Sequence, residues 1–583
     1  MQLLSGNEAI ARGAWEAGCH IGAAYPGTPS TETMESFAAL PDVYAEWANN
    51  EKVALEVAMG ASAAGARVLV TMKHVGVNVC ADPLFTAAYT GVNGGVLILA
   101  ADDPGMFSSQ NEQDSRYYAM ASQVPMLEPS DSAEALSFAK DAFELSEQFD
   151  TPFFIRSNVR ISHTKTPVEV GERKAVAIKD YQTDPSKWVM MPAFAKPRRK
   201  VLAQRINNLR EWVETCPYNR IERNSDSIGI ICAGSQYQHV KEAAPEASVF
   251  KLGVTWPLPA KALRDFAASV DRCYVVEEGS VYLSDQVKAQ GVVLDEFEVP
   301  LPSTGEVHPC DIRASLGKQQ PEHRDVQTDV PGRPPAFCCG CPHRIVFKEL
   351  SRMKAIVTGD IGCYTLGALP PLSAMDTTLD MGASVSMAHG FELALDCNEN
   401  LSRRRPVVAV IGDSTFAHSG LSSLLSTVYN KGAGTVCILD NRTTAMTGQQ
   451  GNPFNGVTLQ HRESNELNLP AILNALGVDK VHQVDSYDLA AVRSALKEAT
   501  SASDRLDVII FQHPCVLLDK SKKPTFVVNE NCTACGVCTK LGCPALSVDE
   551  ETGCAVIDQT QCIGCNQCAQ YCRFDAIGPK EGE

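Results

Sequence analysis

The chain has 583 residues, 44% of them hydrophobic, and a formal net charge of −18 at pH 7. This composition is typical of a globular protein with several domains, and its acidic excess argues against binding to nucleic acids or anionic membranes. The apolar stretches are strand-sized and polar residues break up the N-terminus, so we expect a cytoplasmic protein without a membrane span or signal peptide. In that compartment its 22 cysteines are more readily metal ligands than disulfides.

Residues 1–165 alternate between helix-length segments and short apolar runs such as "RVLVTM" (67–72). This alternation predicts an α/β domain whose parallel sheet is covered on both faces. Residues 166–225 are polar and of mixed charge, so we expect a connector there. A smaller α/β domain is predicted for residues 226–320, and the charged, proline-rich residues 321–335 are predicted to be a linker.

A second large α/β domain is predicted for residues 336–520. Within it, one apolar run ends in Gly412-Asp413, and the next, after a helix-length segment, ends in Asp440-Asn441. Open α/β sheets bind ligands at the carboxyl ends of their strands. An Asp and an Asn there suit Mg²⁺, and a helix starting near Thr415 would aim its N-terminal amides at a phosphate. The sequence therefore predicts a magnesium and phosphate site.

Two cysteine runs occupy residues 524–583, with the spacings C-x2-C-x2-C-x4-C and C-x2-C-x2-C-x3-C. Such tandem runs are the signature of an α+β bacterial-type ferredoxin with two [4Fe–4S] clusters, in which each run lends its fourth cysteine to the other cluster. Zinc, the alternative, takes paired rather than tripled cysteines. The x4 spacing and Arg573, where proline is usual, depart from the pattern. The predicted sets are Cys532, Cys535, Cys538 and Cys572 for the first cluster, and Cys562, Cys565, Cys568 and Cys543 for the second.

The segment from Gly412 to Asn441 resembles the thiamine-diphosphate motif, in which GDG is followed by NN after about 25–30 residues. The resemblance implies that Asp413, Asn441 and the carbonyl of Thr443 bind Mg²⁺. Ser414 and Asp440 depart from the motif at positions that supply no side-chain ligand.

Thiamine enzymes also need a glutamate beside the aminopyrimidine ring of the cofactor, and residues 50–72 resemble the domain that supplies it in 2-oxoacid:ferredoxin oxidoreductases. Glu51 stands at the catalytic position, and Glu56 is its rival on the same helix. The loop "YPGTPST" (25–31) resembles the substrate loop of that family, which makes Thr28 a candidate contact to the oxoacid carboxylate. His74 and Arg116 are further candidates for the substrate pocket.

The whole chain is similar to the large (alpha) subunits of indolepyruvate ferredoxin oxidoreductases, through motifs such as "MKHVGVNVCADPL", "CCGCPHR" and "GDIGCYTLG". The resemblance implies a pyrimidine-binding thiamine domain at 1–165, a transketolase C-terminal-like domain at 226–320 and a diphosphate-binding thiamine domain at 336–520. It implies oxidative decarboxylation of arylpyruvates, chiefly indolepyruvate, with coenzyme A to aryl-acetyl-CoA and CO2. Electrons would leave through the clusters to ferredoxin, and a small beta subunit would complete a heterodimer or a dimer of heterodimers.

Two other functions stay open: a non-oxidative thiamine-dependent 2-oxoacid decarboxylase, and an electron-transfer subunit without thiamine chemistry. A third [4Fe–4S] cluster is also implied, because four cysteines occupy places comparable to cluster ligands in related pyruvate:ferredoxin oxidoreductases. These are Cys338, Cys341, Cys363 and Cys515. The alternative is that they are ordinary buried cysteines, and Cys339 could replace Cys338. His343, His389 and His418 are weaker candidates for the substrate pocket.

Overall fold

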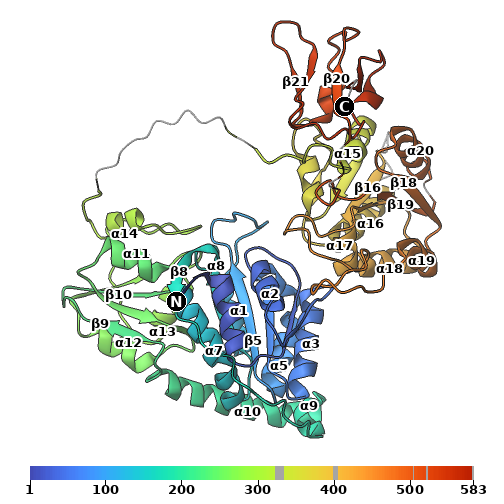
Figure 1. Ribbon diagram of the computed structural model, residues 1–583. Coiled ribbons are helices and arrows are strands. Elements are labelled where there is room, and N and C mark those ends of the chain that lie inside the picture. The colour runs from blue at the N-terminus through green and yellow to red at the C-terminus, as the bar shows by residue number, and fades with distance from the viewer. Residues whose placement is uncertain are drawn as a thin grey trace. The chain divides into compact units, whose positions relative to one another are not determined.

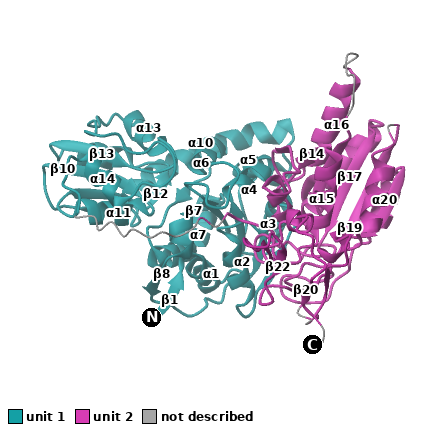
Figure 2. Cartoon of the chain, turned by 90° about the horizontal axis from the view of Figure 1, so that it is seen from above, with its two compact units in different colours: residues 1–327 teal, residues 328–583 magenta. Residues whose placement is uncertain are grey.

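The computed structural model describes residues 1–321, 332, 334–397, 405–502, 504–519, 521 and 523–580. The chain divides into two compact units, residues 1–327 and 328–583, each with its own sheets and core (Figure 2). Most of the predicted linker at 321–335 lies outside the described residues. Within the described part of the chain, no helix combines the length and the hydropathy that a membrane crossing needs.

The first unit is built on a seven-stranded sheet that is parallel except for one edge strand, β12 (Figure 1). Its central strands are buried on both faces, which explains their continuous apolar sequence. In spatial order the strands are β12 (Val254–Trp256), β6 (Met126–Leu127), β7 (Phe153–Asn158), β5 (Val96–Asp102), β4 (Val68–Lys73), β2 (Ile21–Ala24) and β3 (Tyr44–Trp47).

Helices pack against this sheet in groups, α1 with α2 and α7, and α3 with α5. Polar caps fix where several of them begin: Asn50 accepts a hydrogen bond from the Val53 amide at 3.0 Å and so starts α3. The helices are α1 (Gly6–Glu16), α2 (Thr31–Ala38), α3 (Glu51–Ala63), α4 (His74–Val79), α5 (Ala81–Thr90) and α7 (Ser132–Phe149).

A second, four-stranded sheet completes the first unit and corresponds to the smaller α/β domain predicted from the sequence. Its strands are β13 (Arg272–Val276), β10 (Ile228–Ala233), β11 (Ser248–Leu252) and β9 (Arg220–Glu222). Its helices are α11 (Gln236–Ala243), α12 (Ala260–Ala267), α13 (Tyr282–Ala289) and α14 (Pro309–Ser315).

The segment expected to be a connector, residues 166–225, holds more structure than predicted. Helix α10 (Pro192–Val213) runs through it for 22 residues and packs on α5. Its buried positions Leu202, Ile206, Leu209 and Val213 repeat at helical spacing, a weak apolar stripe in a polar sequence. The polar composition therefore masks a packed helix.

The second unit contains a six-stranded parallel sheet with separate apolar clusters on its two faces. Along β16, Val408 and Val410 belong to one cluster and Ala409 and Ile411 to the other, as expected for a strand covered on both sides. The strands in order are β15 (Thr377–Thr378), β14 (Ile356–Gly359), β16 (Val407–Gly412), β17 (Gly434–Asp440), β19 (Leu506–Gln512) and β18 (Lys480–Asp485). The longer helices are α15 (His343–Met353), α16 (Ala383–Asp396), α18 (Leu421–Tyr429) and α20 (Leu489–Ala499).

The C-terminal tail is a small fold of two antiparallel strand pairs. Strand β20 (Phe526–Val528) pairs with β23 (Ile577–Pro579), and β21 (Leu546–Val548) pairs with β22 (Ala555–Ile557). Its apolar core is small and includes several of the cysteines. The predicted fold class, parallel-sheet α/β domains followed by a ferredoxin-type tail, is confirmed.

Candidate active site and cluster sites

The predicted magnesium ligands lie together at the carboxyl edge of the second unit's sheet. Strands β16 and β17 are parallel neighbours, with Gly412 opposite Leu439, so Asp413 and Asn441 follow adjacent strand ends. Asp413 is 2% exposed, and its carboxylate accepts a hydrogen bond from the Asn452 amide at 2.9 Å. Burial, together with the nearby carboxylate of Asp440, raises the pKa of Asp413 to about 7.

This set of donors fits a divalent cation. Asp440 is paired with Arg442 at 3.2 Å, whereas Asp413 is a buried carboxylate whose proton affinity its neighbour raises. A bound cation would stabilise its charged form, and oxygen ligands of this kind suit Mg²⁺. Asn441 and Thr443 are buried beside them. Gly412 is also required by packing, since a Cβ there would lie 2.7 Å from a ring carbon of Tyr364.

Two polar residues at this edge were not predicted. Asn452 comes from a loop with no motif around it, so no sequence signal marks it. Asp360 follows β14 in a second Gly-Asp pair, and its carboxylate accepts hydrogen bonds from the amides of Gly382 and Ser384, both at 3.0 Å. Burial raises the pKa of Asp360 to about 6. The repeat of Gly-Asp at a strand end is the signal that could have found it.

In the first unit, burial separates the two candidate glutamates. Glu51 is the first residue of α3 and is 4% exposed. It packs against α4, because a Cβ on Gly76 would lie 2.6 Å from Oε1 of Glu51. Glu56 is exposed and pairs with Lys52 one turn earlier. The geometry thus favours Glu51 as the buried acid.

The predicted substrate loop follows β2 and is closed by its own hydroxyl groups. The amide of Gly27 donates to the Thr31 hydroxyl at 2.9 Å, and the Ser30 hydroxyl donates to the Gly27 carbonyl at 2.8 Å. Thr28 itself is half-buried. His74 begins α4 and is buried, with Nε2 at 3.1 Å from the Asn111 carbonyl, and this burial lowers its pKa.

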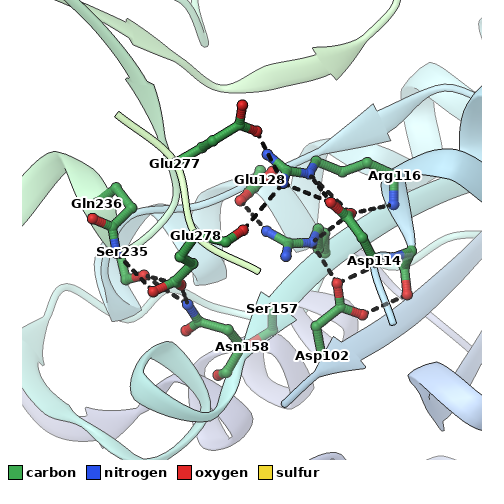
Figure 3. Close-up of polar contacts among 12 residues, drawn as sticks. Asp102, Asp114, Arg116, Glu128, Ser157, Asn158, Ser235, Gln236, Glu277 and Glu278 are labelled. Atoms are coloured by element: carbon green, nitrogen blue, oxygen red, sulfur yellow. Dashed lines mark hydrogen bonds and ion pairs between the residues drawn. The ribbon is translucent and has the colours of Figure 1, made fainter. Parts of the chain in front are cut away.

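Arg116 lies in a buried ionic network where the seven-stranded and four-stranded sheets of the first unit meet (Figure 3). Its guanidinium binds Asp114 at 2.6 Å and Glu277 at 3.3 Å. Because these acids already bind the guanidinium, the structure gives no support to Arg116 as a substrate contact. In the same network Arg156 binds Asp102 at 2.6 Å and Glu128 at 2.5 Å.

The three histidines considered for the substrate pocket, His343, His389 and His418, have different surroundings. His343 is buried between Phe337 and Tyr364, and burial lowers its pKa to about 4, as expected for a packed side chain. His418 is also buried, with Nδ1 at 2.9 Å from the Ser419 hydroxyl. His389 is partly buried on α16 and approaches Gly432.

The tail cysteines gather into the two sets predicted from their spacing, each including the cysteine exchanged between runs. Cys532, Cys535, Cys538 and Cys572 line one cavity, and Cys562, Cys565, Cys568 and Cys543 line another. Some backbone amides point at sulfur, as from Ala576 to Cys572 at 3.3 Å. Among the described residues, no three His, Cys, Asp or Glu side chains converge closely enough for a single metal ion.

The four candidate ligands of a third cluster, Cys338, Cys341, Cys363 and Cys515, are also neighbours. Burial raises the pKa of Cys363 to about 11, and the thiols of Cys515 and Cys338 contribute to this shift. Cys341 is close enough to Cys338 and Cys363 for its pKa to be raised further by them. The amide of Cys515 donates to the Asn441 carbonyl at 2.9 Å, so this set adjoins the predicted magnesium site.

Cys339, the alternative to Cys338, faces the other way. It lines the cavity of the Cys543 set rather than joining Cys363 and Cys515. Consecutive residues of this short loop therefore belong to two different cysteine sites.

Comparison with known proteins follows the same division of the chain. Residues 12–216 match the family model for the thiamine-diphosphate-binding part of pyruvate flavodoxin/ferredoxin oxidoreductases. Residues 360–511 match the C-terminal thiamine pyrophosphate-binding domain of thiamine pyrophosphate enzymes, and residues 555–578 match a 4Fe-4S binding domain.

The most informative relatives are similar along their whole length. The indolepyruvate oxidoreductase subunit IorA of Thermococcus kodakarensis is 39% identical, over 100% of this chain and 97% of that protein. The chain belongs to the IorA subunit family. The IorA subunit of Methanothermobacter marburgensis is 38% identical over 99% of this chain and 97% of its own length.

One solved structure, a 2-oxoglutarate:ferredoxin oxidoreductase from Magnetococcus marinus, is 18% identical. It covers 54% of this chain and 64% of its own with a TM-score of 0.46, a likeness too weak to carry an argument.

Membership of the IorA family confirms the resemblance seen in the sequence. This member is a thiamine-diphosphate-dependent 2-oxoacid:ferredoxin oxidoreductase subunit that binds iron–sulfur clusters. Arg344, which lies beside the cysteine sites, was not predicted. Its buried guanidinium donates to the carbonyls of Cys338 at 3.0 Å and Leu541 at 3.2 Å, and it lines the Cys543 cavity. The motif "CCGCPHR" contains it, but composition gives no hint of its partner.

Proposed function

We propose that this chain is the catalytic subunit of an enzyme that oxidises arylpyruvates, chiefly indolepyruvate. One 2-oxoacid, one coenzyme A and two oxidised ferredoxins would give aryl-acetyl-CoA, CO2, a proton and two reduced ferredoxins. The names of the full-length relatives support indolepyruvate as the substrate. A small second subunit and ferredoxin are the proposed partners.

A single observation carries the proposal: the four cysteines proposed to hold a third cluster adjoin the residues proposed to bind Mg²⁺. The backbone of Cys515 is hydrogen-bonded to that of Asn441, so a cluster on Cys338, Cys341, Cys363 and Cys515 would sit beside the diphosphate site. An enzyme that merely released an aldehyde would have no use for this proximity.

The chain's own residues have separate tasks in this proposal. Asp413, Asn441 and the Thr443 carbonyl would hold Mg²⁺, which orients the diphosphate. Glu51 would hydrogen-bond the aminopyrimidine ring and hold the proton that the ring exchanges. When bound, thiamine diphosphate supplies a nucleophilic carbon and an electron sink for decarboxylation. The three cysteine sets would hold clusters that each accept one electron at a time.

An anaerobic assay of the complete enzyme tests the proposal. Indolepyruvate, phenylpyruvate, pyruvate and 2-oxoglutarate are compared, and CoA-dependent reduction of a low-potential dye is followed with and without the second subunit. We expect the aryl substrates to be preferred and the product to be an acyl-CoA.

Other results point elsewhere. An aldehyde as product selects the non-oxidative decarboxylase. Purified protein with iron and sulfide but without thiamine diphosphate selects the electron-transfer subunit. Equal rates with all four oxoacids remove the arylpyruvate assignment and leave the chemistry intact.

A further inference from the structure

Lys73 is a buried cation that forms no ion pair within the described part of the chain. It ends β4, in the middle of the first unit's main sheet, and is 8% exposed. Its Nζ donates one hydrogen bond, at 2.6 Å, to the backbone carbonyl of Ser108. Among the described residues, no carboxylate oxygen lies within 4.0 Å of Nζ, and Asp103 attracts it only from a greater distance.

This arrangement is costly for the folded protein. An ammonium group has three donors, and removing it from water is compensated only when an anion or several acceptors meet it. Burial accordingly lowers the pKa of Lys73 to about 8. Lys251, a lysine of the same unit that is fully buried, is paired with Glu134. The other buried lysine thus has the partner that Lys73 lacks.

Lys73 lies against the loop that contains Thr28. A Cβ on Gly27 would be 3.1 Å from Cβ of Lys73, so the lysine stem packs directly on that glycine. The Ser108 hydroxyl donates to the Thr28 carbonyl at 3.5 Å, so Ser108 contacts both Lys73 and the loop that contains Thr28. In the described part of the chain, the Thr28 hydroxyl has no hydrogen-bond partner.

These groups lie where a parallel sheet is expected to bind its ligand, at the carboxyl ends of β2 and β4. Helix α4 starts immediately after Lys73, and its residue Gly76 touches the carboxylate of Glu51. The cation therefore lies at the start of α4, and the first turn of the same helix contacts the proposed catalytic acid.

We propose that Lys73 binds the carboxylate of the 2-oxoacid, with the Thr28 hydroxyl as a second donor. This inference rests on the proposed function and adds a residue that determines specificity for acids. A substrate carboxylate would supply the anionic partner that Lys73 lacks among the described residues. Because decarboxylation turns that carboxylate into neutral CO2, the ammonium stabilises the bound substrate more than the transition state. Its loss is therefore expected to raise KM without lowering kcat.

The test uses the complete enzyme and a pair of inert ligands, indole-3-propionate and its neutral isostere indole-3-propionamide. Both lack the oxo group, so their inhibition constants measure binding alone. Lys73→Gln keeps an N–H donor for Ser108 but removes the charge. We expect it to weaken inhibition by the acid about tenfold or more and to leave the amide unchanged. KM for indolepyruvate rises by a similar factor and kcat does not fall.

The matched control is Lys174→Gln, which removes an exposed lysine paired with Glu144. We expect it to change neither constant. Lys73→Arg retains the charge and should keep the preference for the acid. If Lys73→Gln does not fold, Thr28→Val provides the second variant, and it should weaken the acid severalfold and the amide by a smaller factor, because a hydrogen bond to a charged acceptor is the stronger one.

The outcomes separate the two proposals. Equal losses for acid and amide mean that Lys73 only tethers the Ser108 loop, and an unchanged acid constant means that it does not meet the carboxylate; either result overturns the inference. If the wild-type enzyme reduces the dye with none of the four oxoacids, the proposed function itself is wrong.

Discussion

Two regions of buried charge in this chain differ in how the charge is balanced. Around Arg116 and Arg156, the guanidinium groups contact Asp102, Asp114, Glu128 and Glu277. At the end of β16, Asp413 faces Asp440, and its pKa is raised to about 7. In the first region each of these acids lies within 4.0 Å of a guanidinium of the chain. In the second, Arg442 pairs with Asp440 at 3.2 Å, but among the described residues no cation lies within 4.0 Å of Asp413, which is left for a bound cation to balance. Unbalanced buried charge therefore marks the places where a ligand is expected.

The largest effect is expected where the buried acid at the start of α3 is neutralised. Glu51→Gln should lower kcat by about 10²- to 10⁴-fold, the usual contribution of a group that holds a reacting proton. Thiamine diphosphate content should stay the same, measured on the denatured protein. Glu56→Gln, on the exposed face of the same helix, is the control and should keep full activity. Equal losses in the two variants would contradict the assignment.

The balanced region should respond through stability. Arg156→Met leaves Asp102 and Glu128 buried without their cation, which should reduce the free energy of unfolding by about 3–5 kcal/mol. Urea unfolding followed by circular dichroism measures this. Lys261→Met breaks an exposed pair with Asp265 and should cost less than about 1 kcal/mol. A small effect at Arg156 would mean that the network is not structural.

A substitution at Asp413, in the second region, should change cofactor binding rather than reduce stability. Asp413→Asn removes one of two neighbouring acids, so the protein without cofactor should be at least as stable as the wild type. Its affinity for thiamine diphosphate and Mg²⁺ should fall by about 10- to 100-fold or more. Calorimetric titration and urea unfolding test both halves. If the Asp413→Asn protein unfolds more easily than the wild type and binds thiamine diphosphate and Mg²⁺ normally, Asp413 stabilises the fold and does not bind the cofactor.

The smallest effect is a pH dependence at Lys73. Because the pKa of its ammonium is lowered to about 8, the charge is present at pH 7 and mostly lost at pH 9. Binding of indole-3-propionate should weaken about tenfold over that interval, as expected for a base with this pKa, and the amide should not respond.

Other groups near Lys73 do not predict this change. Asp103 has a lowered pKa and stays ionised, His74 has a lowered pKa and stays neutral, and the raised pKa of Asp102 belongs to an acid held by Arg156. Lys73→Gln should abolish the pH dependence. If the dependence persists in that variant, another group carries it.

The sequence predicted those site residues that belong to short, recognisable patterns. Cysteine spacing indicated the two ferredoxin sets, because cluster ligands lie on short turns, and the ends of apolar runs indicated Asp413 and Asn441. Long-range contacts could not be predicted in this way: Arg344 meets the carbonyl of Leu541, 197 residues away. Asn452 and Lys73 likewise acquire their meaning only from neighbours that folding brings to them.

The loop at Cys338–Cys341 ties the tail firmly to the rest of the second unit. Arg344 holds it from one side, and Gln567 and Tyr487 donate to the Gly340 carbonyl at 2.9 and 2.5 Å. A tail fastened in this manner cannot act as a swinging arm that shuttles between donor and acceptor. Transfer inside the unit should then proceed at fixed spacing and be insensitive to solvent viscosity, and only the meeting with a diffusing carrier should slow in glycerol.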